Sequence, residues 1–446
     1  YLNRTLSTAS KRNEVLAVYR VLRPSGGEKC GLGSDTIFRM KIALVASAGL
    51  SLLFLLSCST ATDQGAETAA PQPTGDFHTD SFVMDSHVHV MSRQLLEGTD
   101  FGDRYEDGHV DLPRTIEGGV DAMFFSIYTP EPYYPNRHDV KNTLRLVELA
   151  RQQIEKNNDK IDLARNATDI ERITSDGKVA AFMDLEGPFD LDGDLLVLAG
   201  LYRLGLRSFQ LTAHNFTSNI VDSCCDVSKW GGLNERGRAV VKEANRLGMI
   251  INVAHASEET IQQTVELSED PVIYTHGGFR HFVDIPRCIS DEAAKAIAAK
   301  DGVISIQWGS TFNNPKYFDW KHKGIPIVYD ISKKLGKYAD MTIGEIDAEE
   351  RSRLPFVFKG TMPDEYWMGA DQLAKVVDYG VQLVGEDHIG LGSDFDGGPP
   401  LPREIKDISD YPEMTKALQR LGYGEERIRK ILGLNLLRVI REVTEK

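Results

Sequence analysis

Residues 249–277, MIINVAHASEETIQQTVELSEDPVIYTHG, contain one complete copy of the pattern that decides the fold. Two short runs rich in β-branched and apolar residues, MIINVAH and PVIYTHG, flank a segment whose apolar residues recur three and four positions apart after Ser257. The first pattern is typical of buried strands and the second of an amphipathic helix with a capping serine. A strand, a helix and a second strand in this order predict a parallel βαβ unit.

The same alternation repeats from residue 81 to the end of the chain. Eight such strands, separated by helical segments, predict an α/β fold of the (β/α)8 TIM-barrel type, with an open doubly wound sheet as the alternative. The predicted strands are SFVMDSHVHV (81–90), VDAMFFSIYT (120–129), KVAAFMDLEG (178–187), LRSFQLTAHN (206–215), MIINVAH (249–255), PVIYTHG (271–277), VISIQWG (303–309) and HIGLGSDFDG (388–397).

One connection is much longer than the others. Residues 310–387 separate the seventh and eighth predicted strands, and they include an aromatic-rich segment over 310–363. Insertions of this length in compact domains are usually functional, so we expect a lid or a subunit contact there. Residues 404–446 are predicted to form terminal helices that cover the barrel.

The first 57 residues read as a targeting segment. A Met-Lys pair precedes the apolar run 42–56, which is too short for a comfortable membrane span. The end of this run, LLSC (55–58), resembles the lipobox of bacterial lipoproteins, whose cysteine is lipidated. We therefore expect a signal peptide within 1–57, a lipid anchor on Cys58, a flexible linker over 58–80 and the barrel over 81–446. The expected location is the periplasmic or outer-membrane face of a bacterial cell envelope.

Charge and cysteine content exclude two classes of protein. The 446 residues include 51 basic and 66 acidic side chains, a net charge of −15, whereas a general nucleic-acid binder needs a basic surplus to neutralise phosphates. Five cysteines are too few for a disulfide framework. For Cys224, Cys225 and Cys288 the sequence leaves open a vicinal pair, a pair with Cys288, and free thiols.

Most of the unusual polar residues fall at the C-terminal ends of the predicted strands. Side chains alternate along a strand, so His87 and His89 point to the same side. In an α/β barrel all strands end on one face, where active sites lie. The other polar residues at these ends are Glu186, His214, His255, His276, Asp394 and Asp396.

Several of these residues form a ligand set for metal ions. Neutral imidazoles and a carboxylate suit Zn²⁺ or a similar divalent cation. One tetrahedral ion with an open water position would not use them all, so we expect two ions that share the single central carboxylate. Such a pair can lower the pKa of a bridging water and stabilise the oxyanion of an attacked carbonyl. The expected ligands are His87, His89, Glu186, His255 and His276.

Segments spread over the whole domain resemble the membrane dipeptidases, also called renal dipeptidases, of the amidohydrolase superfamily. The resemblance rests on several segments in the family's order rather than on any single motif. These segments are VDLPRTIEGGVDAMFFSIYTP (110–130), GKVAAFMDLEG (177–187), LRSFQLTAHN (206–215), KWGGLNERGRAVVKEANRLGMIINVAH (229–255), PVIYTHG (271–277), HIGLGSDFDG (388–397) and GLNLLRVIREV (433–443).

The resemblance implies a binuclear zinc centre that hydrolyses dipeptides through an activated hydroxide. By position, His87 and His89 would hold one ion, His255 and His276 the other, and Glu186 would bridge them. The first motif departs from the family's usual His-x-Asp, because an imidazole here replaces a carboxylate. This replacement makes the centre one charge unit more positive.

The resemblance also implies roles on the substrate side. His214 corresponds to the histidine that contacts the substrate near the scissile carbonyl, and Asp394 corresponds to the acid that moves protons. Arg287 corresponds to the arginine that receives the substrate carboxylate, to which a planar guanidinium can donate two parallel hydrogen bonds. A homodimer is expected by family analogy alone.

The principal hypothesis is therefore a lipid-anchored, zinc-dependent dipeptidase. A second hypothesis keeps the metal-dependent hydrolase but changes the substrate to another small amide, such as an N-acyl amino acid or a β-lactam. A third is a metal-binding lipoprotein without turnover, against which the intact set of Glu186, His255, His276 and Asp394 argues.

Overall fold

The computed structural model describes residues 75–187, 191–323 and 331–446, which fall within one compact unit, 66–446. The predicted signal peptide, Cys58 and most of the predicted linker lie outside the described residues. Among the helices of the described ranges, none combines the length and the apolar character needed to cross a membrane.

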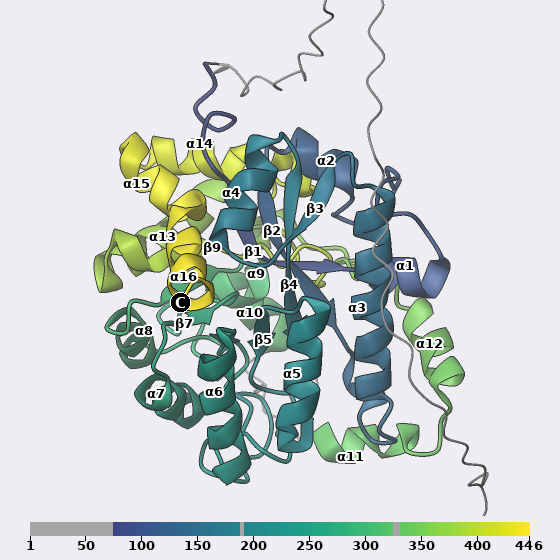
Figure 1. Ribbon diagram of the computed structural model, residues 1–446. Helices are drawn as coiled ribbons and strands as arrows, with labels where there is room; N and C mark the ends of the chain where they lie inside the picture. The colour runs from purple at the N-terminus through teal and green to yellow at the C-terminus, as the bar shows by residue number, and fades with distance from the viewer. Residues whose placement is uncertain (1–74, 188–190, 324–330) are drawn as a thin grey trace, which may run out of the picture. The chain divides into compact units, whose positions relative to one another are not determined.

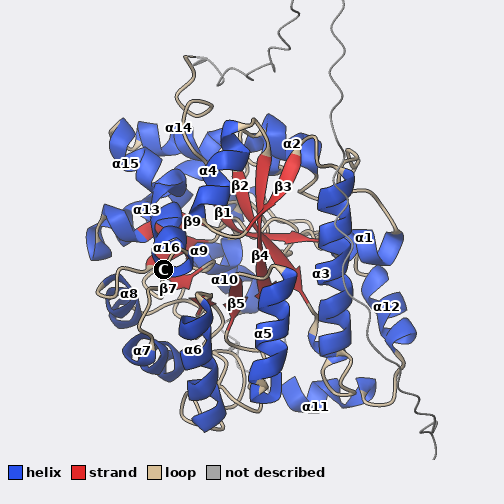
Figure 2. Cartoon of the chain, viewed as in Figure 1, coloured by secondary structure: helices blue, strands red, loops and turns tan. Residues whose placement is uncertain are grey.

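Nine parallel strands of the described chain form one sheet in the order β1-β2-β4-β5-β6-β7-β8-β9, with β3 beside the first half of β4 (Figures 1 and 2). The two ends of the path meet, because His89 N donates to Phe395 O and Asp394 N donates to His87 O, each at 3.0 Å. This arrangement confirms the predicted (β/α)8 barrel type. The strands are β1 (Met84–Val90), β2 (Ala122–Tyr128), β3 (Ile161–Ala164), β4 (Val179–Glu186), β5 (Ser208–Gln210), β6 (Ile250–Asn252), β7 (Val272–Tyr274), β8 (Val303–Ile306) and β9 (Ile389–Leu391).

Helices surround the sheet, and polar side chains cap the first turns of several of them, including Ser257 as predicted. Asn234, Ser257 and Ser290 accept hydrogen bonds from the first-turn amides of the helices after β5, β6 and β7. The helices are α1 (Ser92–Glu97), α2 (Leu112–Glu117), α3 (Asp139–Lys156), α4 (Ala167–Ser175), α5 (Leu195–Leu204), α6 (Glu235–Leu247), α7 (Glu258–Leu267), α8 (Asp291–Ala298), α9 (Ser310–Asn313), α10 (Pro315–His322), α11 (Ile331–Leu335), α12 (Ile343–Arg351), α13 (Ala370–Val384), α14 (Pro412–Arg420), α15 (Glu425–Arg429) and α16 (Asn435–Thr444).

The C-terminal helix α16 closes the floor of the barrel. Met84, Phe124 and Phe182, from the first halves of their strands, share one buried cluster with Leu436 and Ile440 of α16. A second and larger cluster fills the layer between the strands and the outer helices. With the floor filled by apolar side chains, a ligand can enter only at the opposite end, where the strands finish.

The long insertion crosses from the end of β8 to the side of the barrel that carries β1 and β2. The helix α12, drawn in light green in Figure 1, packs against α1, whereas Ile331 and Leu335 of α11 share a buried cluster with Tyr133. Tyr133, just after β2, donates a hydrogen bond to Asp347 of α12 at 2.6 Å. The insertion is therefore attached to the β1–β2 side of the barrel as well as continuing from the end of β8.

Asp121, next to the floor, offers a stability test away from the site. Its carboxylate accepts a hydrogen bond from Val83 N at 2.8 Å, and burial raises the pKa of Asp121 to about 6 from 3.8. A carboxyl group whose pKa is higher in the folded chain than in the unfolded chain stabilises the fold when it is protonated. For Asp121 this contribution is complete below pH 3.8 and is lost as the pH rises through about 6.

Asp121→Asn keeps an acceptor oxygen without the charge. The free energy of unfolding should rise by up to about 3 kcal/mol at pH 7.5 but by only about 1 kcal/mol at pH 4.5, because one pKa unit corresponds to about 1.4 kcal/mol. Urea titrations at the two pH values measure the difference. A gain that does not change with pH would contradict the assigned cause.

Candidate metal centre and substrate cavity

The structure brings every predicted site residue of the barrel to the mouth at the C-terminal ends of the strands. These residues come from six different strands or the loops that follow them, so the barrel itself sets their spacing. They are His87 and His89 on β1, Glu186 at the end of β4, His214 after β5, His255 after β6, His276 and Arg287 after β7, and Asp394 after β9.

Glu186 lies between two pairs of histidines. Its Oε2 atom is 3.0 Å from Nε2 of His87 and 3.2 Å from Nε2 of His89. Its Oε1 atom is 3.4 Å from Nε2 of His255 and 3.6 Å from Nε2 of His276. Each oxygen of one buried carboxylate therefore faces one imidazole pair.

The same side chains fit divalent cations on chemical grounds. Nδ1 of His255 lies 2.9 Å from the acceptor Oδ1 of Asn215, so Nδ1 carries the proton and the neutral ring presents a lone pair at Nε2. That lone pair faces Nε2 of His276 at 3.1 Å. Two buried oxygens, Glu186 Oε2 and Asp394 Oδ1, accept no hydrogen bond among the described residues. Converging ring nitrogens around buried anionic oxygens are what a cation would satisfy.

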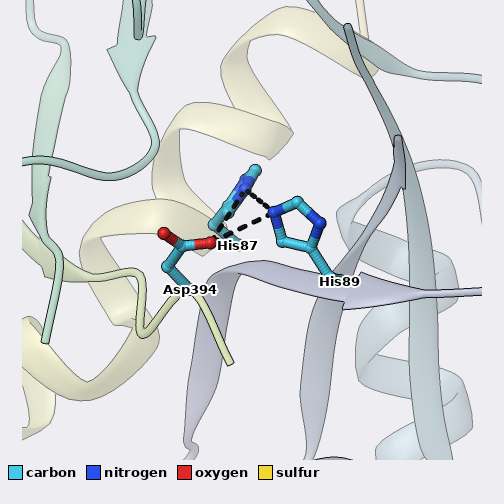
Figure 3. A group of neighbouring side chains, drawn as sticks. All are labelled: His87, His89 and Asp394. Atoms are coloured by element: carbon cyan, nitrogen blue, oxygen red, sulfur yellow. Dashed lines mark hydrogen bonds and ion pairs between the residues drawn. The ribbon is translucent and has the colours of Figure 1, made fainter. Parts of the chain in front are cut away.

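The β1 side of the cluster brings two histidines against the Asp394 carboxylate (Figure 3). Nε2 of His89 lies 3.1 Å from Asp394 Oδ1 and 3.2 Å from Nε2 of His87. Burial by itself opposes the charged ring, but the Glu186 and Asp394 carboxylates outweigh it and raise the pKa of His89 to about 10. The other oxygen of Asp394 accepts a hydrogen bond from the Gln307 amide.

Four residues at the mouth hold a left-handed backbone that side chains other than glycine seldom adopt. The φ angles are 55° at His214, 63° at His255, 60° at Asp394 and 58° at Asp396. Such a backbone persists only where the surroundings impose it, and it concentrates at functional sites. Here Ser223 Oγ donates to the carbonyls of both histidines, at 2.8 Å to His214 and 3.1 Å to His255.

His214 stands beside the cluster and is paired with a residue that the sequence did not single out. Its Nδ1 lies 2.6 Å from Glu131 Oε1, while its Nε2 lies 3.9 Å from Glu186 Oε1. Burial opposes both charges, but their attraction prevails, so the pKa of His214 is raised and that of Glu131 is lowered. Glu131 follows β2 directly, and its place at a strand end is the signal that could have identified it.

Arg287 is buried with part of its guanidinium unused. Its Nη1 donates to the Tyr274 hydroxyl at 2.8 Å and its Nη2 donates to the His276 carbonyl at 3.0 Å. Its Nε has no acceptor among the described residues, although the side chain is only 5% exposed. A buried cation that lines a cavity with a spare donor suits an anionic group of a ligand.

These residues surround a cavity of about 600 Å³. The metal-ligating candidates lie on one side, and the long insertion supplies much of the rest of the wall. Thr311, Phe312 and Phe356 are among its contributions. A cavity of this size encloses a small molecule rather than a folded chain.

The other polar candidates take different places. Asp396 lines the cavity, but its carboxylate accepts a hydrogen bond from His109 N at 2.6 Å and lies outside the candidate metal groups of the described chain.

Cys224 and Cys225 form a vicinal disulfide, and Cys288 is free and buried. This result decides among the pairings that the sequence leaves open. Cys225 lines the cavity.

Comparison with known sequences finds one family over most of the chain. The family described as membrane dipeptidase, peptidase family M19, matches residues 73–446. The dipeptidase tcpJ of Claviceps purpurea is 29% identical over 349 residues, which cover 76% of this chain and 70% of that protein. The dipeptidase verJ of Clonostachys rogersoniana is 28% identical over 351 residues, which cover 76% of each chain.

Solved structures share the fold. The probable dipeptidase PvdM from Pseudomonas aeruginosa superposes with a TM-score of 0.69 at 24% identity, covering 83% of this chain and 97% of that one. A metallopeptidase from Rhodobacter sphaeroides, solved with a phosphinate mimic of the dipeptide L-Ala-D-Ala, gives a TM-score of 0.63 at 22% identity, covering 82% and 100%.

Proposed function

The chain belongs to the membrane dipeptidase family, peptidase family M19, and from this membership we propose that it hydrolyses dipeptides with the help of two divalent cations, zinc foremost. One observation supports the proposal above the others. A single buried glutamate turns one oxygen to each of two histidine pairs, next to a buried arginine with a spare donor. Two cations that share a carboxylate, beside an anion-binding group, match the needs of dipeptide hydrolysis.

The ligand assignment follows the distances around Glu186. His87 and His89 would hold one ion, His255 and His276 the other, and Glu186 would join them. Asp394 Oδ1 is close enough to His89 for Asp394 to be a further ligand of the first ion. It would then supply the carboxylate that the family's His-x-Asp motif provides and that this chain lacks at position 89. When bound, the ions would polarise the scissile carbonyl and make a water molecule more acidic.

The remaining polar groups would act on the substrate. His214 directs Nε2 toward the cluster, where it would stabilise the negative charge that develops on the carbonyl oxygen. Asp394, which lies between His89 and Gln307, would carry a proton to the leaving amine. Arg287 would receive the free carboxylate of the dipeptide, which restricts the enzyme to short substrates.

The cellular setting is a separate part of the proposal. A lipid on Cys58, at the end of LLSC, would tether the barrel to the bacterial envelope through residues that follow the signal peptide. Incorporation of a labelled fatty acid that depends on Cys58, compared with Cys58→Ser, tests the anchor.

The function is tested by metal removal and a substrate panel. The purified protein should contain about two ions per chain, lose dipeptide hydrolysis on chelation and regain it with Zn²⁺. The panel includes dipeptides, their C-terminal amides, N-acyl amino acids and a β-lactam. Faster turnover of another amide than of every dipeptide would overturn the substrate assignment. Bound metal without hydrolysis of any amide would favour the non-catalytic alternative.

A further inference from the structure

The carboxylate of Glu131 accepts a hydrogen bond from the imidazole of His214, whose other nitrogen faces the proposed reaction centre. We infer that Glu131 is a positioning residue, which holds the His214 ring so that Nε2 points at the scissile carbonyl of the bound dipeptide. The inference rests on the proposed function for the identity of the substrate. The orientation of the ring is a property of the protein alone.

Glu131 is itself fixed on both sides. Its Oε2 atom accepts a hydrogen bond from the Tyr128 hydroxyl at 3.1 Å, which leaves Oε1 for the His214 ring. The backbone next to it is tied to the metal-ligating strand, because Thr129 N donates to Glu186 O at 2.9 Å. Two residues further on, the Tyr133 hydroxyl is bonded to α12 of the insertion. The carboxylate therefore has little freedom to leave His214.

The hydrogen bond decides which ring nitrogen faces the cluster. A carboxylate only accepts, so Nδ1 of His214 is the donor at 2.6 Å and Nε2 is the atom left for the substrate. Without Glu131 the ring could turn about its side-chain bonds. The backbone of His214 would still be held by Ser223, whose hydroxyl donates to the His214 carbonyl. Loss of Glu131 should therefore misplace the imidazole without displacing the loop.

The kinetic test is a double-mutant cycle. Glu131→Ala should lower kcat for a dipeptide by about 100-fold, the scale of a misplaced catalytic group, while KM stays within about threefold and metal content stays unchanged. In a His214→Gln background, Glu131→Ala should cost less than about twofold. An equal loss in both backgrounds would show that Glu131 does not act through His214.

A second measurement does not depend on turnover. NMR spectra of the wild type labelled with ¹⁵N-histidine should show a signal from a slowly exchanging Nδ1 proton. The loss of this signal in His214→Gln would assign it to His214. Glu131→Ala should abolish this signal. Glu350→Gln, a change at another buried glutamate, which pairs with Arg353 of the cavity wall, should preserve it.

The two measurements separate the inference from the function. A wild type without dipeptidase activity but with a Glu131-dependent proton signal would overturn the substrate and keep the positioning role. Persistence of the His214 signal in Glu131→Ala would overturn the positioning role, whatever the enzyme hydrolyses.

Discussion

Glu186→Gln is expected to lower kcat/KM for dipeptides by about 1000-fold and to reduce the bound metal below two ions per chain. The change keeps the shape of the side chain and removes one charge. In the wild type each carboxylate oxygen of Glu186 lies within 3.6 Å of two histidine nitrogens. An amide offers one weakly ligating oxygen and one NH₂ group, which would point donors at ring nitrogens meant to hold a cation. If two ions share Glu186 as proposed, one of them should therefore lose this ligand.

Elemental analysis after dialysis and steady-state kinetics measure the two effects. Glu350→Gln is the matched control, because Glu350 is equally buried at 1% exposure but pairs with Arg353 outside the histidine cluster. The control should keep its metal and at least half of the wild-type kcat. A Glu186→Gln variant with full metal and full turnover would remove the bridging role.

The second large effect is expected at Arg287. Arg287→Lys keeps the charge but loses the planar guanidinium. In the wild type this group donates hydrogen bonds to Tyr274 and His276, and its Nε is without an acceptor among the described residues. Hydrogen bonds to charged groups contribute about 1.5–3 kcal/mol, so kcat/KM for dipeptides should fall about 10- to 100-fold, mainly through KM.

Substrates without the carboxylate provide the internal control. The wild type should have a low kcat/KM for dipeptide amides, and Arg287→Lys should change this value little. The ratio of kcat/KM for free dipeptides to that for amides should therefore fall in the variant. Arg280→Lys, in the same loop but bonded to the Cys288 carbonyl and paired with Glu258, should leave this preference intact. An equal loss on both substrate types would show that Arg287 supports the fold rather than the carboxylate.

The fold could be predicted from the sequence because strand and helix periods differ clearly. All eight predicted strands exist, and the segment predicted to be helical after Ser257 forms α7, Glu258–Leu267. The missed element is β3, which has four residues with two aliphatic side chains, Ile161 and Leu163, pointing one way. Alternation over four residues between two helices is too short to separate from a loop. Its place beside β4 depends on the length of β4, whose second half pairs with β5.

The convergence of the candidate ligands could also be predicted, since parallel strands of a barrel all end at one mouth. The partners of those ligands could not. Glu131 and Gln307 reach His214 and Asp394 through side-chain rotamers that no pattern in the sequence records. The pairing of Cys224 with Cys225, rather than with Cys288, likewise depends on distances that only the folded loop defines.

The position of α16 has a consequence for biosynthesis. The seam of the barrel joins β1 to residues 394 and 395, and the floor is completed by residues 436–443. Synthesis therefore produces β1 well before the segments that close the barrel. His87 and His89 leave the ribosome before Asp394 does, so the nascent chain cannot complete this candidate ligand set until residue 394 has emerged.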